Sequence, residues 1–201
     1  MKKFIIKNSP INSITIIYTE EPFIIEEIIL SNPEGSSDDL SIKKYGELES
    51  VNSRNLPPLL KRIVKDIIAY LNGENIEFNP FYVNCLNLSK LTPFQEEVLI
   101  AEFETDRGSI NTYKELAERV DNPKAYRAVG SALANNPFPL IIPCHRTIKS
   151  NNTIGGFDGY SGGLETKRIL LEIEGLEIEG RNLISNSPII SLDKSKQTRL
   201  M

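Results

Sequence analysis

Short runs of apolar and β-branched residues dominate the first fifty positions of the chain. These strand-like runs lie at 4–6, 11–19 and 23–30. Glu21-Pro22 separates the last two and is typical of a turn. A helix is predicted over 57–72, because apolar residues recur there at helical spacing and Asn72-Gly73 ends the pattern. The first part therefore resembles a small α+β unit without a cluster of reactive side chains.

The second part of the chain is helical and well punctuated. The stretch 74–91 has no clear period, and we expect it to be a linker that runs over the surface. A capping box at Thr92-Pro93-Phe94-Gln95 predicts a helix to about Glu104. A second capping box at 112–115 predicts a short helix to about Val120. A third helix, predicted from Asn122-Pro123 to about 135, completes a helix-turn-helix.

Small side chains mark the third helix. They are Ala125, Ala128, Gly130, Ser131, Ala132 and Ala134. Such a helix can approach another molecule closely, or it can pack tightly in the protein's own core. Phe138 to Ile142 should form a strand, because the residue before Pro143 favours extended geometry, and Cys144 would then stand at a strand end. A Gly-rich loop at 155–163 precedes a last helix over about 164–174, and 176–201 resembles a partly ordered tail.

Composition narrows the class of protein. The chain has 201 residues, a net charge of -4, two cysteines and one histidine. Two cysteines make no disulfide framework, the short apolar run at the N-terminus is too short for a signal peptide, and no stretch reaches the roughly 18 apolar residues of a membrane span. We therefore expect a cytoplasmic protein without a membrane partner, a metal or another cofactor.

Charge is unevenly distributed along the chain. No Asp or Glu occurs between Asn122 and Phe157, whereas acidic residues crowd the N-terminal part. The cations in this window are Lys124, Arg127, Arg146 and Lys149. A local basic face can meet phosphates even on an acidic protein, although four cations also fit an ordinary solvated surface.

Pro143-Cys144-His145-Arg146 is the main candidate for chemistry. The only histidine lies directly beside one of the two cysteines. A thiol must become a thiolate to act as a nucleophile, and an imidazole can take its proton. By itself, such a pair more often reflects an inert buried cysteine with a structural histidine beside it.

The order of motifs resembles the O(6)-alkylguanine-DNA alkyltransferase family over residues 90–175. The matching segments are Thr92 to Gln95, Thr112-Tyr113, Asn122 to Gly130, Asn136-Pro137, Pro143 to Arg146, Tyr160 to Leu164, Lys167 and Glu174-Gly175. The resemblance implies an α+β protein with a β-rich ribonuclease-H-like domain at 1–89, a winged-helix-like DNA-binding and catalytic domain at 90–175, and a tail at 176–201. The loop between Cys144 and Tyr160 is longer than in the shorter family pattern.

The resemblance also implies a role for each matching residue. Cys144 would accept an alkyl group from guanine O(6) in a single irreversible transfer, His145 would take the thiol proton through an ordered water, and Glu174 would polarise His145. Asn136 would brace the turn below, and Tyr113 would rotate the phosphate beside the flipped nucleotide. Arg127 would fill the gap in the duplex. The remaining DNA contacts implied on the minor-groove helix are Lys124, Ala128 and Ser131. The implied substrate pocket comprises Pro139, Thr147, Tyr160, Ser161 and, near its rim, Lys167.

Double-stranded DNA carrying O(6)-alkylguanine is the partner that the resemblance implies, bound by a monomer. Two other classes of function remain open from the residues. A helix-turn-helix DNA-binding protein without transfer activity would leave Cys144 inert and bind sequence-specifically. A thiol hydrolase or redox protein would use Cys144 and His145 and turn over repeatedly.

Overall fold

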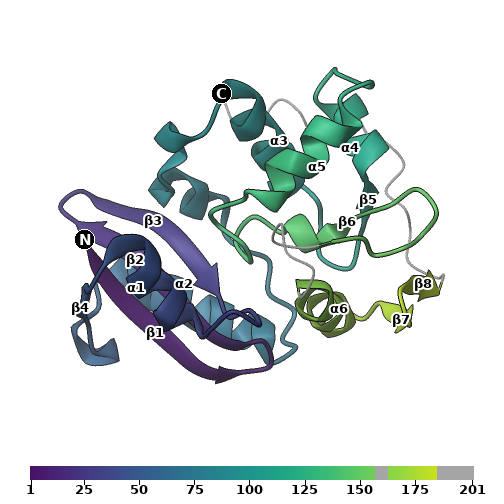
Figure 1. The fold of residues 1–201 in the computed structure, drawn as a ribbon. Helices are drawn as coiled ribbons and strands as arrows, with labels where there is room; N and C mark the ends of the chain where they lie inside the picture. Colours follow the sequence, from purple (N-terminus) through teal and green to yellow (C-terminus); the bar gives the residue numbers. More distant parts are fainter. Residues whose placement is uncertain (157–162, 185–201) are drawn as a thin grey trace.

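A four-stranded sheet forms the first part of the protein. The computed structural model describes residues 1–156 and 163–184. The strands β1 (Lys2–Ser9), β2 (Asn12–Glu20), β3 (Phe23–Leu30) and β4 (Glu49–Ser50) lie in the order β3-β2-β1-β4. The first three pair antiparallel and β4 joins β1 in parallel, which confirms the three predicted strands and the turn at Glu21-Pro22 (Figure 1).

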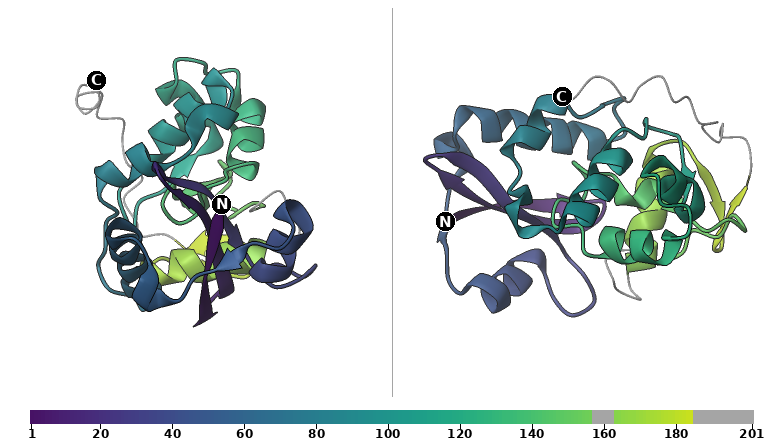
Figure 2. Two further views of the ribbon diagram at one scale, coloured as in Figure 1. Left: turned by 90° about the vertical axis from the view of Figure 1, so that its left-hand side faces the viewer. Right: turned by 90° about the horizontal axis from the view of Figure 1, so that it is seen from above.

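Helices cover both faces of this sheet. Figure 2 shows α1 (Ser37–Tyr45) on one side and α2 (Pro58–Leu71) on the other. The predicted helix at 57–72 is confirmed as α2, which turns Leu60, Ile63 and Ile67 into the core. Because both faces are covered, the central residues of β2 are buried on successive positions and do not alternate with exposed ones.

The sequence pattern gave no sign of α1. Its segment has no apolar stripe, and its buried positions are Ser37 and Ser41. Hydroxyl groups attach it to the sheet: Thr15 Oγ1 lies 2.8 Å from Ser37 Oγ, and Ser37 Oγ donates to Ser13 Oγ at 2.9 Å. A helix held by serine hydrogen bonds leaves no hydrophobic period for sequence reasoning to detect.

The stretch 74–91 is not a surface linker. It contains the 3₁₀ helices Pro80–Cys85 and Leu88–Lys90. Its side chains at Tyr82, Cys85 and Leu86 are buried. The backbone N–H of Asn87 also donates to the carbonyl of Ile25 in β3 at 2.9 Å. The prediction was wrong because isolated apolar residues between turns have no period, yet they pack into the core.

The helix-turn-helix is confirmed, with one shifted boundary. Helices α3 (Pro93–Phe103) and α4 (Tyr113–Arg119) begin at the two predicted capping boxes, and both boxes have reciprocal hydrogen bonds. Helix α5 runs over Tyr126–Ala134, so it begins later than predicted. Asn122 does not cap α5: its N–H donates back to the carbonyl of Ala117 at 2.9 Å and so closes the end of α4.

Residues 138–142 form a compact turn and not the predicted strand. The N–H of Ile142 donates to the carbonyl of Phe138 at 2.9 Å, and Leu140 adopts a positive φ of 75°. Cys144 therefore does not end a strand, because it begins the 3₁₀ helix Cys144–Arg146. Pro143 disfavours helical geometry at Ile142 but is equally compatible with a turn there, which is why the prediction was wrong.

The last described elements complete the fold. The short parallel pair β5 (Asn111–Thr112) and β6 (Thr147–Ile148) flanks the 3₁₀ turn. Helix α6 (Gly163–Ile173) confirms the last predicted helix and is followed by an antiparallel hairpin, β7 (Glu177–Glu179) and β8 (Asn182–Ile184). This hairpin is the ordered beginning of the predicted tail, and residues 185–201 lie outside the described residues.

One continuous core joins the two parts of the chain. The main cluster of buried apolar residues extends from Ile6 in β1 to Leu170 in α6. The N–H of Ile28 in β3 also donates to the carbonyl of Pro137, just before the turn at 138–142, at 2.8 Å. The first part of the protein is thus packed directly against the segment that carries Cys144.

Helix α2 provides a paired test of this packing. Ile67 is 0% exposed and its neighbour Ile68 is 42% exposed on the same helix. Ile67→Ala should lower the free energy of unfolding by about 2–5 kcal/mol, because it leaves a cavity between α2 and the sheet. Ile68→Ala should change it by less than about 0.5 kcal/mol. Urea denaturation measures both, and equal losses would contradict the assigned face of the helix.

Candidate active site

The turn below Cys144 is held by one asparagine. Asn136 follows α5, is buried, and accepts the backbone N–H of Phe138 on Oδ1 at 2.9 Å. Its Nδ2 donates to the carbonyl of Ile142 at 2.9 Å and to Cys144 Sγ at 3.1 Å. The amide therefore fixes the turn and also places a hydrogen-bond donor on the sulfur, which favours the thiolate form over the thiol.

A buried carboxylate faces the histidine that follows Cys144. His145 and Glu174 are both fully buried in their side chains, and His145 Nε2 lies 2.9 Å from Glu174 Oε1. Arg146 donates from Nε and Nη2 to the same carboxylate at 2.9–3.1 Å, and the backbone N–H of Gly108 donates to Oε2 at 3.0 Å. Tyr70 donates its hydroxyl to Oε1 at 2.8 Å.

Burial and neighbouring charges determine the protonation states of His145 and Glu174. Burial lowers the pKa of His145, and the opposing effect of Glu174 is smaller, so the imidazole is neutral at neutral pH. Burial alone would raise the pKa of Glu174, but His145 and Arg146 together hold it well below its usual range. A neutral imidazole whose Nε2–H points at a carboxylate keeps Nδ1 as its basic nitrogen. The pair can therefore accept a proton and stabilise the resulting cation.

A second buried group of charges meets at Thr147. Glu102 on α3 and Lys167 on α6 are both 0% exposed. Thr147 Oγ1 donates to Glu102 Oε2 at 2.6 Å, and Lys167 Nζ donates to the carbonyl of Thr147 at 2.5 Å. Burial lowers the pKa of Lys167 to about 8, while negative charge on Cys144 and on Glu102 opposes the decrease. Lys167 thus supplies an interior cation to the region of the thiol, not a group at a pocket rim as expected.

Tyr113 lies between α5 and the loop that follows β6. A Cβ placed on Gly130 would lie 3.7 Å from its ring, and a Cβ on Gly155 would lie 3.4 Å from its hydroxyl. Burial raises the pKa of Tyr113 to about 12, with smaller contributions from the charges of Glu102 and Cys144. The hydroxyl is therefore a neutral donor throughout the physiological pH range.

One face of α5 is open to solvent and carries basic and small side chains. Its exposed members are Tyr126, Arg127, Ala128 and Ser131, and the exposed Lys124 precedes the helix. Val129, Ala132 and Leu133 on the opposite face are buried, so the small residues serve both internal packing and an open surface. The guanidinium of Arg127 lies 5.8 Å from the ring centroid of Tyr126.

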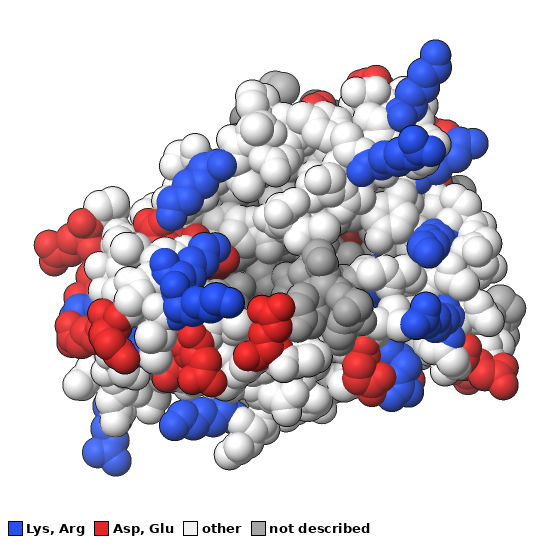
Figure 3. Space-filling view, viewed as in Figure 1, with Lys and Arg blue, Asp and Glu red and all other residues white. Residues whose placement is uncertain are grey.

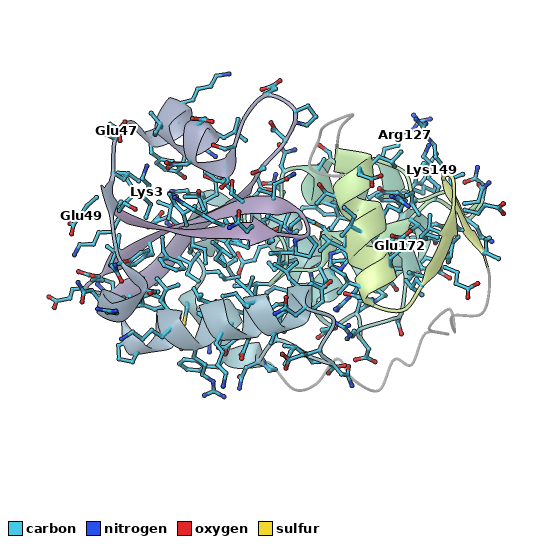
Figure 4. The ribbon with its side chains drawn as sticks, turned by 90° about the horizontal axis from the view of Figure 1, so that it is seen from below. Lys3, Glu47, Glu49, Arg127, Lys149 and Glu172 are labelled. Carbon is cyan, nitrogen blue, oxygen red and sulfur yellow. The ribbon has the colours of Figure 1, made fainter. Side chains whose placement is uncertain are left out.

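The basic window in the sequence becomes a basic end of the molecule. Figure 4 shows Arg127 and Lys149 projecting at the end opposite Glu47 and Glu49. In Figure 3, acidic and basic side chains are mixed over the sheet, and the region of α4 and α5 is mainly basic or neutral. Arg146, counted with this face from its sequence, is buried against Glu174 and does not belong to the surface.

The remaining candidates for the substrate pocket fall into two groups. Pro139 is buried in the turn at 138–142, and Thr147 directs its hydroxyl into the interior toward Glu102. Tyr160 and Ser161 lie outside the described residues, as does most of the Gly-rich loop.

The contacts of three residues in the site could not be predicted from the sequence. Tyr70 belongs to the apolar stripe of α2, and nothing in the local pattern indicates a polar partner for its hydroxyl. Arg146 resembles a surface cation in sequence, and Glu102 is one of three glutamates in an otherwise ordinary helix. Each is recognised only when its partner, which lies far away in the chain, is brought next to it by the fold.

Comparison with known families gives matches over most of the chain. A family model described as "6-O-methylguanine DNA methyltransferase, DNA binding domain" matches residues 93–176. A methylated-DNA--protein-cysteine methyltransferase from Haemophilus influenzae is 36% identical over 165 residues, which are 79% of this chain and 86% of that protein. Its counterpart from Methanothermobacter thermautotrophicus is 36% identical over 140 residues, 70% and 72% of the two chains.

Solved structures resemble this fold over a similar length. The Mycobacterium tuberculosis O6-methylguanine methyltransferase has a TM-score of 0.65 at 26% identity and covers 86% of this chain and 92% of that one. A structure of the M. tuberculosis protein in complex with DNA has a TM-score of 0.63, also at 26% identity, with 87% and 92% covered. The mixed α+β architecture is therefore shared with these proteins.

The described residues contain no candidate for a membrane-spanning helix or a metal site. None of their helices has the length and apolar character that a membrane crossing requires. Their His, Cys, Asp and Glu side chains form no group arranged to hold a metal ion.

The buried Lys167 provides a test of the charges near the thiol. Its pKa is about 8 in the folded protein, against about 10.4 for an unfolded chain. Between these values the unfolded state binds more protons, so this group makes stability increase as pH rises. Between pH 7 and 10.5, the free energy of unfolding of the wild-type protein should therefore rise by up to about 3 kcal/mol relative to that of Lys167→Met.

Urea denaturation across that pH range measures the difference. Lys61→Met, which alters an exposed lysine of α2, is the matched control and should keep a constant difference from wild type. A constant difference for Lys167→Met as well would mean that the ammonium of Lys167 is not held in the interior.

Proposed function

The chain belongs to the methylated-DNA--protein-cysteine methyltransferase family, and on this basis we propose that it repairs DNA by moving the alkyl group of O(6)-alkylguanine onto Cys144. The observation that carries the assignment of this residue is the arrangement around the sulfur. Asn136 donates to Sγ, and the next residue, His145, contacts a buried carboxylate. Burial raises the pKa of the only other thiol, Cys85, which makes it a poor nucleophile.

Activation of the thiol begins with proton transfer. The proton of Cys144 passes through an ordered water to the basic nitrogen of His145, and Glu174 stabilises the imidazolium that forms. Asn136 Nδ2 and the ammonium of Lys167 stabilise the thiolate left behind. Neutral His145 and anionic Glu174 are the states that this step requires.

Transfer then occurs in one displacement. The thiolate sulfur forms a bond to the alkyl carbon, the bond from that carbon to guanine O(6) breaks, and the electron pair returns to the base. The N–H of Ser161 and the hydroxyl of Tyr113 donate to the base as negative charge develops on it. The product thioether has no leaving path, so each molecule reacts once.

The base must leave the helical stack before it can react. Helix α5 lies in the minor groove, where Ala128 and Ser131 allow close approach and Lys124 contacts phosphate. Arg127 occupies the space of the flipped nucleotide, and Tyr113 turns the adjacent phosphate. Flipping costs a few kcal/mol, which these contacts offset.

The pocket for the flipped base is formed around the same turn. Pro139 and Thr147 contribute its buried floor, and Tyr160 forms a wall beside Ser161. Lys167 acts on the thiolate of Cys144 through its charge, from the interior of the protein. The protein binds duplex DNA as a monomer, and its free thiols suit the reducing cytoplasm.

We also propose that the chain consists of two domains. Residues 1–89 form a ribonuclease-H-like domain, and 90–175 form a winged-helix-like domain that carries the chemistry. The sheet flanked by helices and the α4–α5 helix-turn-helix support these assignments. The alternative of a helix-turn-helix protein without transfer activity is not favoured, because the relatives are named as methyltransferases.

The stoichiometry of transfer tests the function directly. After mixing with excess duplex DNA that contains O(6)-methylguanine, each protein molecule should gain one methyl group, located on Cys144 by peptide mass spectrometry. Cys144→Ala should gain none while it still binds the duplex, and Cys85→Ser should react like wild type. Product in molar excess over protein would indicate turnover and sink the single-transfer mechanism.

Arg127 allows base extrusion to be separated from chemistry. Free O(6)-benzylguanine needs no flipping, so Arg127→Ala should lose at least about tenfold in rate on duplex DNA and little on the free base. Rates should be measured at saturating DNA, with Lys61→Ala as a control cation distant from α5. Equal losses on the two substrates would show that Arg127 does not act in flipping.

A further inference from the structure

A tyrosine from the first part of the protein reaches the proposed relay. Tyr70 lies near the end of α2, outside the segment 93–176 that matches the family model. Its side chain is 0% exposed. Its hydroxyl donates to Glu174 Oε1 at 2.8 Å and lies 3.0 Å from His145 Nε2. The three groups form a closed triangle, since Nε2 is itself 2.9 Å from Oε1.

Apolar packing explains the ring of Tyr70 but not its hydroxyl. Ile63, Ile67 and Leu71 lie on the same buried stripe of α2, and a phenylalanine would fill the place of the ring equally well. A buried hydroxyl must find a hydrogen-bond partner or lower the stability of the fold. Here it meets the single carboxylate oxygen that also faces the imidazole.

The ring is held in place on two sides. Phe78 packs against it with centroids 5.6 Å apart, and the guanidinium of Arg107 lies 5.1 Å from its centroid. Arg107 also donates from Nη2 to the carbonyl of Ile173 at 2.7 Å, one residue before Glu174. The hydroxyl and the carboxylate are therefore connected directly by their hydrogen bond and indirectly through Arg107 and Ile173.

The hydroxyl acts as a donor throughout. Burial, reinforced by the negative charge of Glu174, raises the pKa of Tyr70 well above its ordinary value, so it keeps its proton. A donated hydrogen bond withdraws charge from Oε1 and reduces the attraction of the carboxylate for an imidazolium. The other charged groups that face His145 are Arg146 and Lys167, and both disfavour its protonation.

We propose that Tyr70 is a positioning residue of the transfer reaction: its hydroxyl fixes Glu174 Oε1 against His145 Nε2 and sets how readily the imidazole takes and returns the Cys144 proton. This inference rests on the proposed function. It makes the first part of the protein a component of the catalytic site, because the relay is incomplete without a side chain from α2.

Tyr70→Phe tests the proposal, because it removes the hydroxyl and keeps the ring. The rate of Cys144 alkylation by free O(6)-benzylguanine should be measured from pH 5 to 9, so that DNA binding does not enter. We expect a loss of about tenfold at neutral pH, the size associated with one hydrogen bond to a charged group. The acidic half-rate pH should also move upward, because Glu174, without this donor, holds the imidazolium proton more tightly.

A matched control distinguishes this role from packing. Tyr82→Phe removes another tyrosine hydroxyl, which donates to Asp66 outside the site, and it should leave both the rate and the half-rate pH unchanged. In a Glu174→Gln background, Tyr70→Phe should have little further effect on either quantity.

Failure of the Tyr70 role and failure of the proposed function would give different results. Wild-type rate and half-rate pH in Tyr70→Phe, or full additivity with Glu174→Gln, would overturn the role of Tyr70. Absence of Cys144 alkylation in the wild-type protein would instead refute the proposed function itself.

Discussion

A buried carboxylate is tolerated only where donors and cations surround it, and Glu174 at the end of α6 meets this condition. Its partners come from separate regions: Tyr70 from α2, Gly108 from the loop after α3, and His145 and Arg146 from the turn that carries the nucleophile. Without this charge, Arg146 would be a buried cation lacking its counterion. The contacts that hold the two parts of the chain together are thus the same ones that prepare His145 to accept a proton.

Local rules predicted much of the architecture. The capping boxes that begin at Thr92 and Thr112 each use neighbouring residues only, so the starts of α3 and α4 could be read from the sequence. The apolar period of α2 was equally local. The nucleophile and its histidine were also identifiable, because they are adjacent and the chain offers one histidine.

Features that depend on distant partners were not predictable. Helix α1 is attached through Ser37 to hydroxyls of strand β2, and no hydrophobic pattern reports such contacts. The same holds for Glu102, whose partner Thr147 is 45 residues away. The start of α5 was misplaced because Asn122 does not accept an N–H of α5 but donates its own N–H to the carbonyl of Ala117 in α4, and only the fold decides between the two. Sequence reasoning therefore identified the reactive group, while the charges that control it emerged only from the tertiary structure.

A chain with a single imidazole carries a built-in spectroscopic probe at its centre. His145 is the only histidine and is fully buried, so every imidazole resonance of the protein originates from this one ring. Nitrogen chemical shifts distinguish the two neutral tautomers from the cation, and a shielded Nε2–H exchanges slowly enough with solvent to be observed. The protonation and tautomer of the relay can consequently be followed by magnetic resonance of 15N-labelled protein during binding and transfer, without residue assignment.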